Sequence, residues 1–145
     1  MQIRIQPQPF TLAAMLDGFG IGAGAIVTFS GIVRDDTGQM TALELEHYPG
    51  MTEKAVTAIA ENAFDRWNLT DLAVIHRFGR LEVGETIMAV ATAARHRADA
   101  FAAAEYLMDF LKSRAPFWKR EISVDGPGQW VAAKDADEDA LARWD

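Results

Sequence analysis

Two long segments with helical spacing divide this chain of 145 residues into three groups of strand-like segments. Residues 52–67 and 98–113 repeat apolar side chains at the spacing of a helix that buries one face. The remaining patterned segments are short, and they either alternate polar with apolar residues or are rich in β-branched residues. Turn-forming residues separate most of them by only a few positions. This order predicts an α+β fold with largely antiparallel strand pairing.

The first pair of strands is expected to form a hairpin. Residues 25–33 are apolar and β-branched and predict a buried strand, whereas residues 41–48 alternate and predict a half-exposed strand. Residues 34–38 lie between them and have the composition of a turn. Further strands are expected at residues 3–5, 72–75, 86–93, 118–124 and 130–132.

Helix boundaries follow from local signals. Thr11 is expected to cap a short helix over residues 12–16, and Thr52 is expected to cap the first long helix. Pro116 is expected to end the second long helix, since proline cannot donate a backbone hydrogen bond.

Length and composition indicate one soluble domain over residues 1–145. The length is close to the commonest domain size, and a hydrophobic content of 50% is too high for a disordered chain. No apolar run is long enough to span a membrane, and residues 1–10 lack the apolar centre of a secretory signal. We therefore expect a cytoplasmic protein with an acidic tail at about 135–145, a loose helix anchored by Leu141 and Trp144.

The chain contains no cysteine. It therefore has no thiol nucleophile, and any sulfur used in its chemistry must arrive on another molecule. His47, His76 and His96 lack metal-binding spacing, so no metal site is expected. His47 lies in an expected strand and His76 at the end of another, and both are interpreted as structural.

Positive charge is concentrated in one part of an otherwise acidic chain. The net charge is −7, yet residues 95–120 contain six basic and three acidic residues. A local cationic site in an acidic protein fits a small anion better than nucleic acid. The alternative is that Lys112 and Arg114 only complement the end of a helix.

The segment from residue 111 to residue 121 is the richest in potential chemistry. A helix ends, a proline turns the chain, and a strand begins, so Lys112 and Lys119 can approach one pocket. Lysines between apolar walls can serve as general acid or base, or stabilise an anionic intermediate. The alternative is that Lys112 caps the helix while Lys119 is a solvated strand residue. Arg95, His96 and Arg97 either form a phosphate site or are ordinary loop residues.

Four short motifs, in this order and spacing, resemble the large subunit of molybdopterin synthase. The resemblance extends from Pro7 to Trp144. The motifs are residues 45–55 (LEHYPGMTEKA), residues 74–77 (VIHR) with Gly79, His96-Arg97 with Phe101, and residues 111–121 (LKSRAPFWKRE).

The resemblance implies an α/β hammerhead-like fold with an additional antiparallel β subdomain. It also implies an enzyme of molybdenum cofactor biosynthesis, a sulfurtransferase that converts cyclic pyranopterin monophosphate into the molybdopterin dithiolene. The sulfur would come from a small ubiquitin-like carrier subunit whose C-terminal Gly-Gly ends in a thiocarboxylate. Two large subunits would form the central homodimer of a heterotetramer, with no metal or organic cofactor, no nucleic acid and no membrane involved.

The resemblance also assigns site residues. Lys112 and Lys119 correspond to the catalytic lysines of the family. Ile32 departs from the pattern, because the family often has lysine there. The positions that correspond to substrate contacts, some of them reached across the dimer, are Val33, Arg34, His96, Arg97, Lys112, Lys119, Arg120 and Glu121.

One alternative function of a different class is open at this point. The same cations, without a recognisable nucleophile, would suit a non-catalytic dimeric module that binds a phosphorylated metabolite or the C-terminal tail of a partner.

Overall fold

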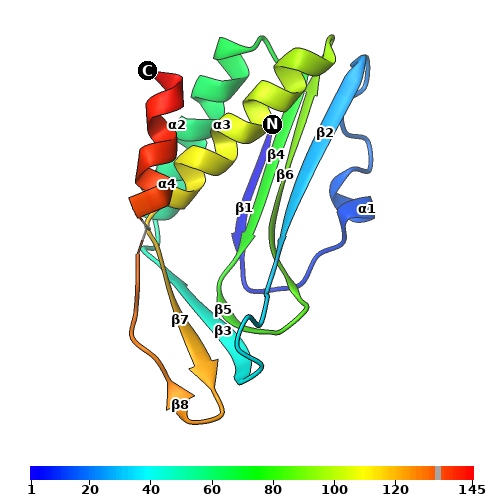
Figure 1. Ribbon diagram of the computed structural model, residues 1–145. Coiled ribbons are helices and arrows are strands. Elements are labelled where there is room, and N and C mark those ends of the chain that lie inside the picture. The colour runs from blue at the N-terminus through cyan, green and yellow to red at the C-terminus, as the bar shows by residue number, and fades with distance from the viewer. Residues whose placement is uncertain (133–134) are drawn as a thin grey trace.

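A four-stranded sheet forms the larger part of the molecule (Figure 1). The computed structural model describes residues 1–132 and 135–145. The strand order is β1–β4–β6–β2, in which β1 and β4 are parallel and the other neighbours are antiparallel. These strands are β1 (Gln2–Gln6), β2 (Ala25–Ile32), β4 (Asp71–Arg77) and β6 (Thr86–Ala94). The two inner strands are buried over most of their length, because both faces of the sheet are covered.

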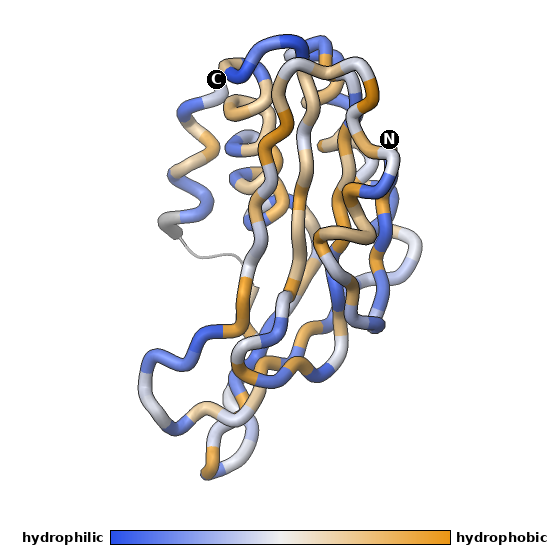
Figure 2. The backbone as a smooth tube through the Cα atoms, turned by 90° about the vertical axis from the view of Figure 1, so that its right-hand side faces the viewer, coloured by the Kyte–Doolittle hydropathy of each residue, from blue (hydrophilic) through white to orange (hydrophobic). Residues whose placement is uncertain are grey.

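Two long helices, α2 (Met51–Arg66) and α3 (Arg97–Arg114), lie side by side on one face of this sheet (Figure 1). Hydrophobic residues recur along the strands beneath them (Figure 2). Both predicted helices are confirmed, and α3 ends two residues before Pro116, as expected. The largest fully buried apolar side chains of this core are Val56, Leu72, Val74, Val90 and Leu107.

The opposite face of the sheet carries the short helix α1 (Leu12–Met15). The Thr11 hydroxyl accepts a hydrogen bond from the Ala14 backbone at 3.1 Å, so the predicted cap is confirmed. Met15 packs on side chains that alternate with those facing the long helices, among them Ala73 and Ala89.

A second four-stranded sheet, fully antiparallel, extends from one end of the first (Figure 1). Its order is β5–β3–β7–β8. Its strands are β3 (Met40–His47), β5 (Gly79–Glu82), β7 (Phe117–Ser123) and β8 (Gly126–Pro127). A small core of Val33, Leu43, Leu45 and Leu81 holds it to the rest of the molecule. The expected α+β fold is therefore confirmed.

The expected hairpin between residues 25–33 and 41–48 is wrong. β2 pairs with β6 in the first sheet, whereas β3 pairs with β5 and β7 in the second. Turn-forming residues show where a chain bends, but they do not identify the partner of the next strand. β2 is also an edge strand rather than a buried one. It exposes three large apolar side chains: Ile26, Phe29 and Ile32.

The start of α2 also differs from the prediction. Gly50, at a φ of 82°, is the N-cap, and its backbone N–H donates to the Glu53 carboxylate at 2.8 Å. Thr52 lies in the first turn, fully buried, and its hydroxyl bonds the backbone of Tyr48 instead. The expected strand at residues 130–132 is reduced to a single bridge between Val131 and Lys119.

The acidic tail packs against the long helices. It forms α4 (Asp135–Ala140) and the 3-10 helix η1 (Leu141–Trp144). The Trp144 ring lies 5.5 Å from Trp67 and 5.4 Å from Tyr106, and its indole N–H donates to Asp109 at 2.6 Å. Leu141 is buried, so both expected anchors are confirmed. Within the described residues, no helix is long and apolar enough to cross a membrane.

Candidate active site

A cavity of about 460 Å³ lies where the two sheets meet the C-terminal end of α3. Its walls come from the end of β2, from β3, β4 and β6, from the last turns of α3, and from β7. The apolar part of the lining includes Leu43, Leu45 and Phe117. Charged groups therefore meet a substrate here against walls that are partly apolar.

Lys112 and Lys119 both line this cavity. Lys112 is on the last turn of α3, and Pro116 then turns the chain into β7, which carries Lys119. The Lys119 backbone is held on its second side by Val131, through hydrogen bonds of 2.9 and 2.8 Å. The Lys112 side chain is exposed and Lys119 is half-buried. The helix end, the proline and the strand thus bring two ammonium groups to one space.

Besides the two lysines, three further expected substrate contacts line the same cavity: Val33, Arg34 and Glu121. Val33 is buried, and its backbone exchanges hydrogen bonds with the turn before β6, at 2.9 Å to both Gly84 and Glu85. Arg34 is exposed and pairs with Asp36 at 2.8 Å. The cavity mouth therefore has an arginine whose charge is shared with an acidic neighbour.

Arg120 is directed elsewhere. Successive side chains of a strand point to opposite faces, so Arg120 faces away from Lys119 and Glu121. Its guanidinium donates to Glu44 at 3.1 Å and lies 4.5 Å from the centre of the Trp130 ring. Arg120 is not among the residues that line the cavity.

His96 and Arg97 lie at the opposite end of α3 from Lys112. Both are exposed, and His96 is the N-cap without a side-chain hydrogen bond to the helix. Arg97 and Lys112 are fifteen positions apart in the helix, and about 22 Å apart along the axis at a rise of about 1.5 Å per residue. One chain does not bring these two groups of residues together.

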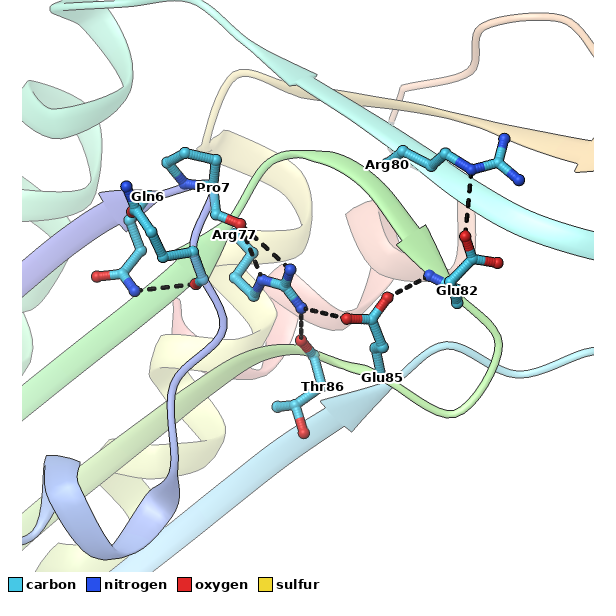
Figure 3. A network of polar contacts seen from close by, with 8 residues as sticks. Gln6, Pro7, Arg77, Arg80, Glu82, Glu85 and Thr86 are labelled. Atoms are coloured by element: carbon cyan, nitrogen blue, oxygen red, sulfur yellow. Dashed lines mark hydrogen bonds and ion pairs between the residues drawn. The ribbon is translucent and has the colours of Figure 1, made fainter.

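A buried arginine fixes the chain beside the cavity (Figure 3). Arg77, only 6% exposed, donates to the Pro7 carbonyl at 3.3 and 3.2 Å, to Glu85 at 3.2 Å and to the Thr86 carbonyl at 3.3 Å. Glu85 also accepts from the Glu82 backbone N–H. The hydrogen bond from Glu82, followed by that from Arg77, holds the pKa of the Glu85 carboxyl below its usual value. The network joins the segment after β1 to the turn before β6.

His76 also lines the cavity, which the sequence pattern did not indicate. Its Nδ1 lies 2.8 Å from the Arg77 carbonyl, and its ring stacks on Phe117 at 3.8 Å. Burial lowers the pKa of His76 to about 4. His47, by contrast, bonds Thr52 at 3.1 Å and is not part of the cavity lining, in keeping with a structural role.

No cluster of three or more metal-ligating side chains occurs among residues 1–132 and 135–145. The ionisable side chains that line the cavity carry ammonium, guanidinium, imidazole and carboxylate groups. Paired lysines against partly apolar walls are suited to stabilising negative charge that develops on an oxygen or sulfur atom.

Comparisons with known proteins identify relatives of this chain over nearly its whole length. The family model described as MoaE protein matches residues 5–114. The chain is 60% identical to the molybdopterin synthase catalytic subunit of Cereibacter sphaeroides, over 99% of this chain and all of that protein. It superposes on the molybdopterin biosynthesis MoaE protein of Burkholderia ambifaria with a TM-score of 0.85 and 49% identity, covering 99% of this chain and 97% of the other.

A more distant structure shares the fold. One chain in the complex of subunits 1 and 2 of the Helicobacter pylori molybdopterin-converting factor matches with a TM-score of 0.75 at 20% identity, covering 92% of this chain and 90% of the other. The full-length match to the bacterial catalytic subunits, together with the family model, settles the family. The chain belongs to the MoaE family, the sulfur-transferring catalytic subunits of molybdopterin synthase in molybdenum cofactor biosynthesis.

Proposed function

We propose that this chain replaces oxygen by sulfur on cyclic pyranopterin monophosphate, using Lys112 and Lys119 as its catalytic residues. The sulfur comes from the C-terminal thiocarboxylate of a small ubiquitin-like subunit. In each transfer a carbon–sulfur bond forms, a carbon–oxygen bond breaks, and water then cleaves the acyl–sulfur bond. The net result is one oxygen exchanged for one sulfur, with the carrier left as a carboxylate. The reaction takes place in the cytoplasm.

The observation that carries this proposal is that both lysines line one cavity. The incoming thiocarboxylate, the substrate phosphate and the tetrahedral intermediate are all anionic. Two ammonium groups attract the reactants and stabilise the oxyanion that forms when sulfur adds. Because the chain has no cysteine, the sulfur atom is supplied from outside. Family membership favours this enzyme over a non-catalytic binding module.

The small subunit is the expected partner. The relatives are named catalytic subunits, and the structure from Helicobacter pylori holds two kinds of subunit together. The cavity lined by Lys112 and Lys119 suits an extended C-terminal tail that ends in a negative charge.

A second copy of this chain is needed to complete the site. β2 is an edge strand, and three of its apolar side chains are 43–49% exposed. Its first residue, Ala25, pairs with Ala94, close to His96, and its last residue, Ile32, adjoins the cavity. If two β2 edges meet in antiparallel fashion about a two-fold axis, the start of one strand lies beside the end of the other. His96 and Arg97 of the partner then approach this cavity and bind the substrate phosphate.

Reconstitution with purified components tests the reaction. The assay contains this chain, its thiocarboxylated small subunit and cyclic pyranopterin monophosphate, and it measures the dithiolene product. Lys112→Ala and Lys119→Ala are each expected to lower the rate by about a hundredfold or more, the cost of losing a group that stabilises an oxyanion. Lys54→Ala, an exposed lysine on α2, is the matched control and is expected to leave the rate unchanged.

Circular dichroism verifies that each variant is folded. Normal turnover by both cavity variants would contradict the assigned roles. A stable complex of the unaltered chain with its carrier that makes no product would contradict the reaction itself.

A further inference from the structure

His76 lines the cavity with one ring nitrogen already engaged. It is the second-last residue of β4, and its Nδ1 lies 2.8 Å from the Arg77 carbonyl oxygen. A carbonyl only accepts hydrogen bonds, so Nδ1 carries a proton and donates it. In the neutral ring, Nε2 then holds a lone pair. This is the nitrogen left to meet a group in the cavity.

The surroundings keep the ring neutral. Burial is the main cause of its low pKa of about 4, and the charges of Lys112 on α3 and His47 on β3 oppose protonation further. The hydrogen bond to Arg77 acts in the opposite direction but is outweighed. At neutral pH His76 is therefore an acceptor toward the cavity and carries no charge. The other charged residues that line the cavity are Arg34, Asp36, Lys119, Glu121 and Asp137.

The same ring connects the two sheets. It stacks on Phe117 with 3.8 Å between ring centres and 16° between planes. His76 belongs to the first sheet, whereas Phe117 begins the strand of the second sheet that carries Lys119. Phe117 and Lys119 are two residues apart and share a face of β7. The stack therefore joins the end of β4 to the face of β7 that carries Lys119.

We propose that His76 is a positioning residue for sulfur transfer: its Nε2 accepts a hydrogen bond from the Lys112 ammonium group, and its stack on Phe117 places Lys119. The inference rests on the proposed function of the two lysines. A neutral acceptor suits this task better than a carboxylate would, because it orients the ammonium group without cancelling its charge. The full positive charge of Lys112 is then available to the thiocarboxylate and to the oxyanion.

Nitrogen NMR of the protein with ¹⁵N-labelled histidine tests the contact without any turnover. At pH 7 we expect the His76 ring to be neutral with its proton on Nδ1. We expect the Nε2 resonance to move in Lys112→Ala and to stay in place in Lys54→Ala, the matched control. A proton on Nε2, a charged ring, or an Nε2 resonance that is unchanged in Lys112→Ala would overturn the proposal, whatever the activity of the enzyme.

Kinetics test the consequence. His76→Phe keeps a ring for the stack but has no nitrogen, and we expect its kcat to fall by about tenfold or more while KM for the pterin changes less than about twofold. His76→Gln supplies an amide acceptor but no ring to stack on Phe117, so it is expected to recover only part of the loss. His47→Phe removes a neighbouring ring nitrogen that does not line the cavity, and it is expected to stay within about threefold of the unaltered enzyme.

The pH profile separates positioning from proton transfer. His76 stays neutral above about pH 5, so its titration should not affect the rate near neutral pH. The plots of kcat against pH for the unaltered enzyme and for His76→Phe are therefore expected to have the same shape near pH 6.5. A change of rate near pH 6.5 that is present in the unaltered enzyme and missing in His76→Phe would overturn the positioning role. A His76→Phe variant with the original kcat would overturn it too. If the NMR result holds but the unaltered enzyme forms no product, the proposed function fails while the contact stands.

Discussion

At the scale of single residues, the cavity presents an arginine that can attract an anionic substrate and a carboxylate that competes for that arginine. Arg34 pairs with Asp36 at 2.8 Å, and both side chains line the cavity. An anionic substrate that approaches Arg34 must therefore displace or tolerate the carboxylate. Both partners are largely exposed, so water screens the pair and its energy is small. A small energy of this kind still changes the affinity for a charged substrate.

Neutralising this carboxylate should tighten substrate binding. Asp36→Asn is expected to lower KM for the pterin phosphate by up to about fivefold, the effect of an exposed ion pair worth at most about 1 kcal/mol. The change should shrink at high salt, because screening weakens exposed charges. Asp65→Asn, an exposed aspartate on α2, is the control. An unchanged KM at low salt in Asp36→Asn would show that the carboxylate does not compete.

The sequence predicted that Lys112 and Lys119 approach one pocket, but it did not predict all of the side chains beside them. Lys112 and Lys119 could be predicted because a helix end, a proline and a strand start lie within a few residues of one another. Arg120 could not be placed by proximity in sequence, since strand alternation turns it toward Glu44. His76 looked structural because its position within a strand does not show that the strand ends at a cavity. That information lies in the second sheet, which covers this end of β4.

At the scale of elements, the junction between the two sheets determines where the residues of the site lie. Local patterns predicted both long helices and six of the eight strands that the structure describes, but not the short strands β5 and β8. They did not predict that residues 34–38 cross from one sheet to the other, because pairing is set by contacts distant in sequence. The Arg77 network stabilises this junction from the side of the first sheet (Figure 3).

Replacing Arg77 should therefore destabilise the fold even when the positive charge is kept. Arg77→Lys keeps the charge but cannot donate from a fork to Pro7, Glu85 and Thr86 together, and we expect it to lower the free energy of unfolding by about 1–3 kcal/mol. Arg80→Lys is the matched control. Its exposed pair with Glu82 should contribute no more than about 0.5 kcal/mol. Urea denaturation measures both, and equal losses would refute the special role of the buried arginine.

At the scale of the whole molecule, the unpaired edge of β2 is the main exposed apolar feature of the first sheet. An unpaired strand that shows Ile26, Phe29 and Ile32 to solvent invites another strand. Pairing with a second copy would cover these side chains and bring the positive end of one α3 toward the other chain's cavity. The exposed apolar edge and the proposed reaction thus both favour a dimer that pairs through β2.

A charge on this edge should separate the copies. Ile26→Lys is expected to convert a dimer into a monomer in sedimentation equilibrium, since pairing would bury the ammonium group. Val124→Lys places the same charge at an exposed position after β7 and should leave the assembly intact. If Ile26→Lys remains dimeric, the two copies meet through another surface.

The length of α3 has a consequence for mixtures of defective chains. The helix holds Arg97 and Lys112 too far apart to serve one cavity, so in the proposed dimer each shared site would draw on opposite ends of two helices. A chain lacking Lys112 and a chain lacking Arg97 are then both inactive alone. Mixed and reassembled in equal amounts, they form hybrids in which one site has both defects and the other has none, so about a quarter of all sites recover. Two broken enzymes would complement each other in a test tube, and in a cell that carries both alleles.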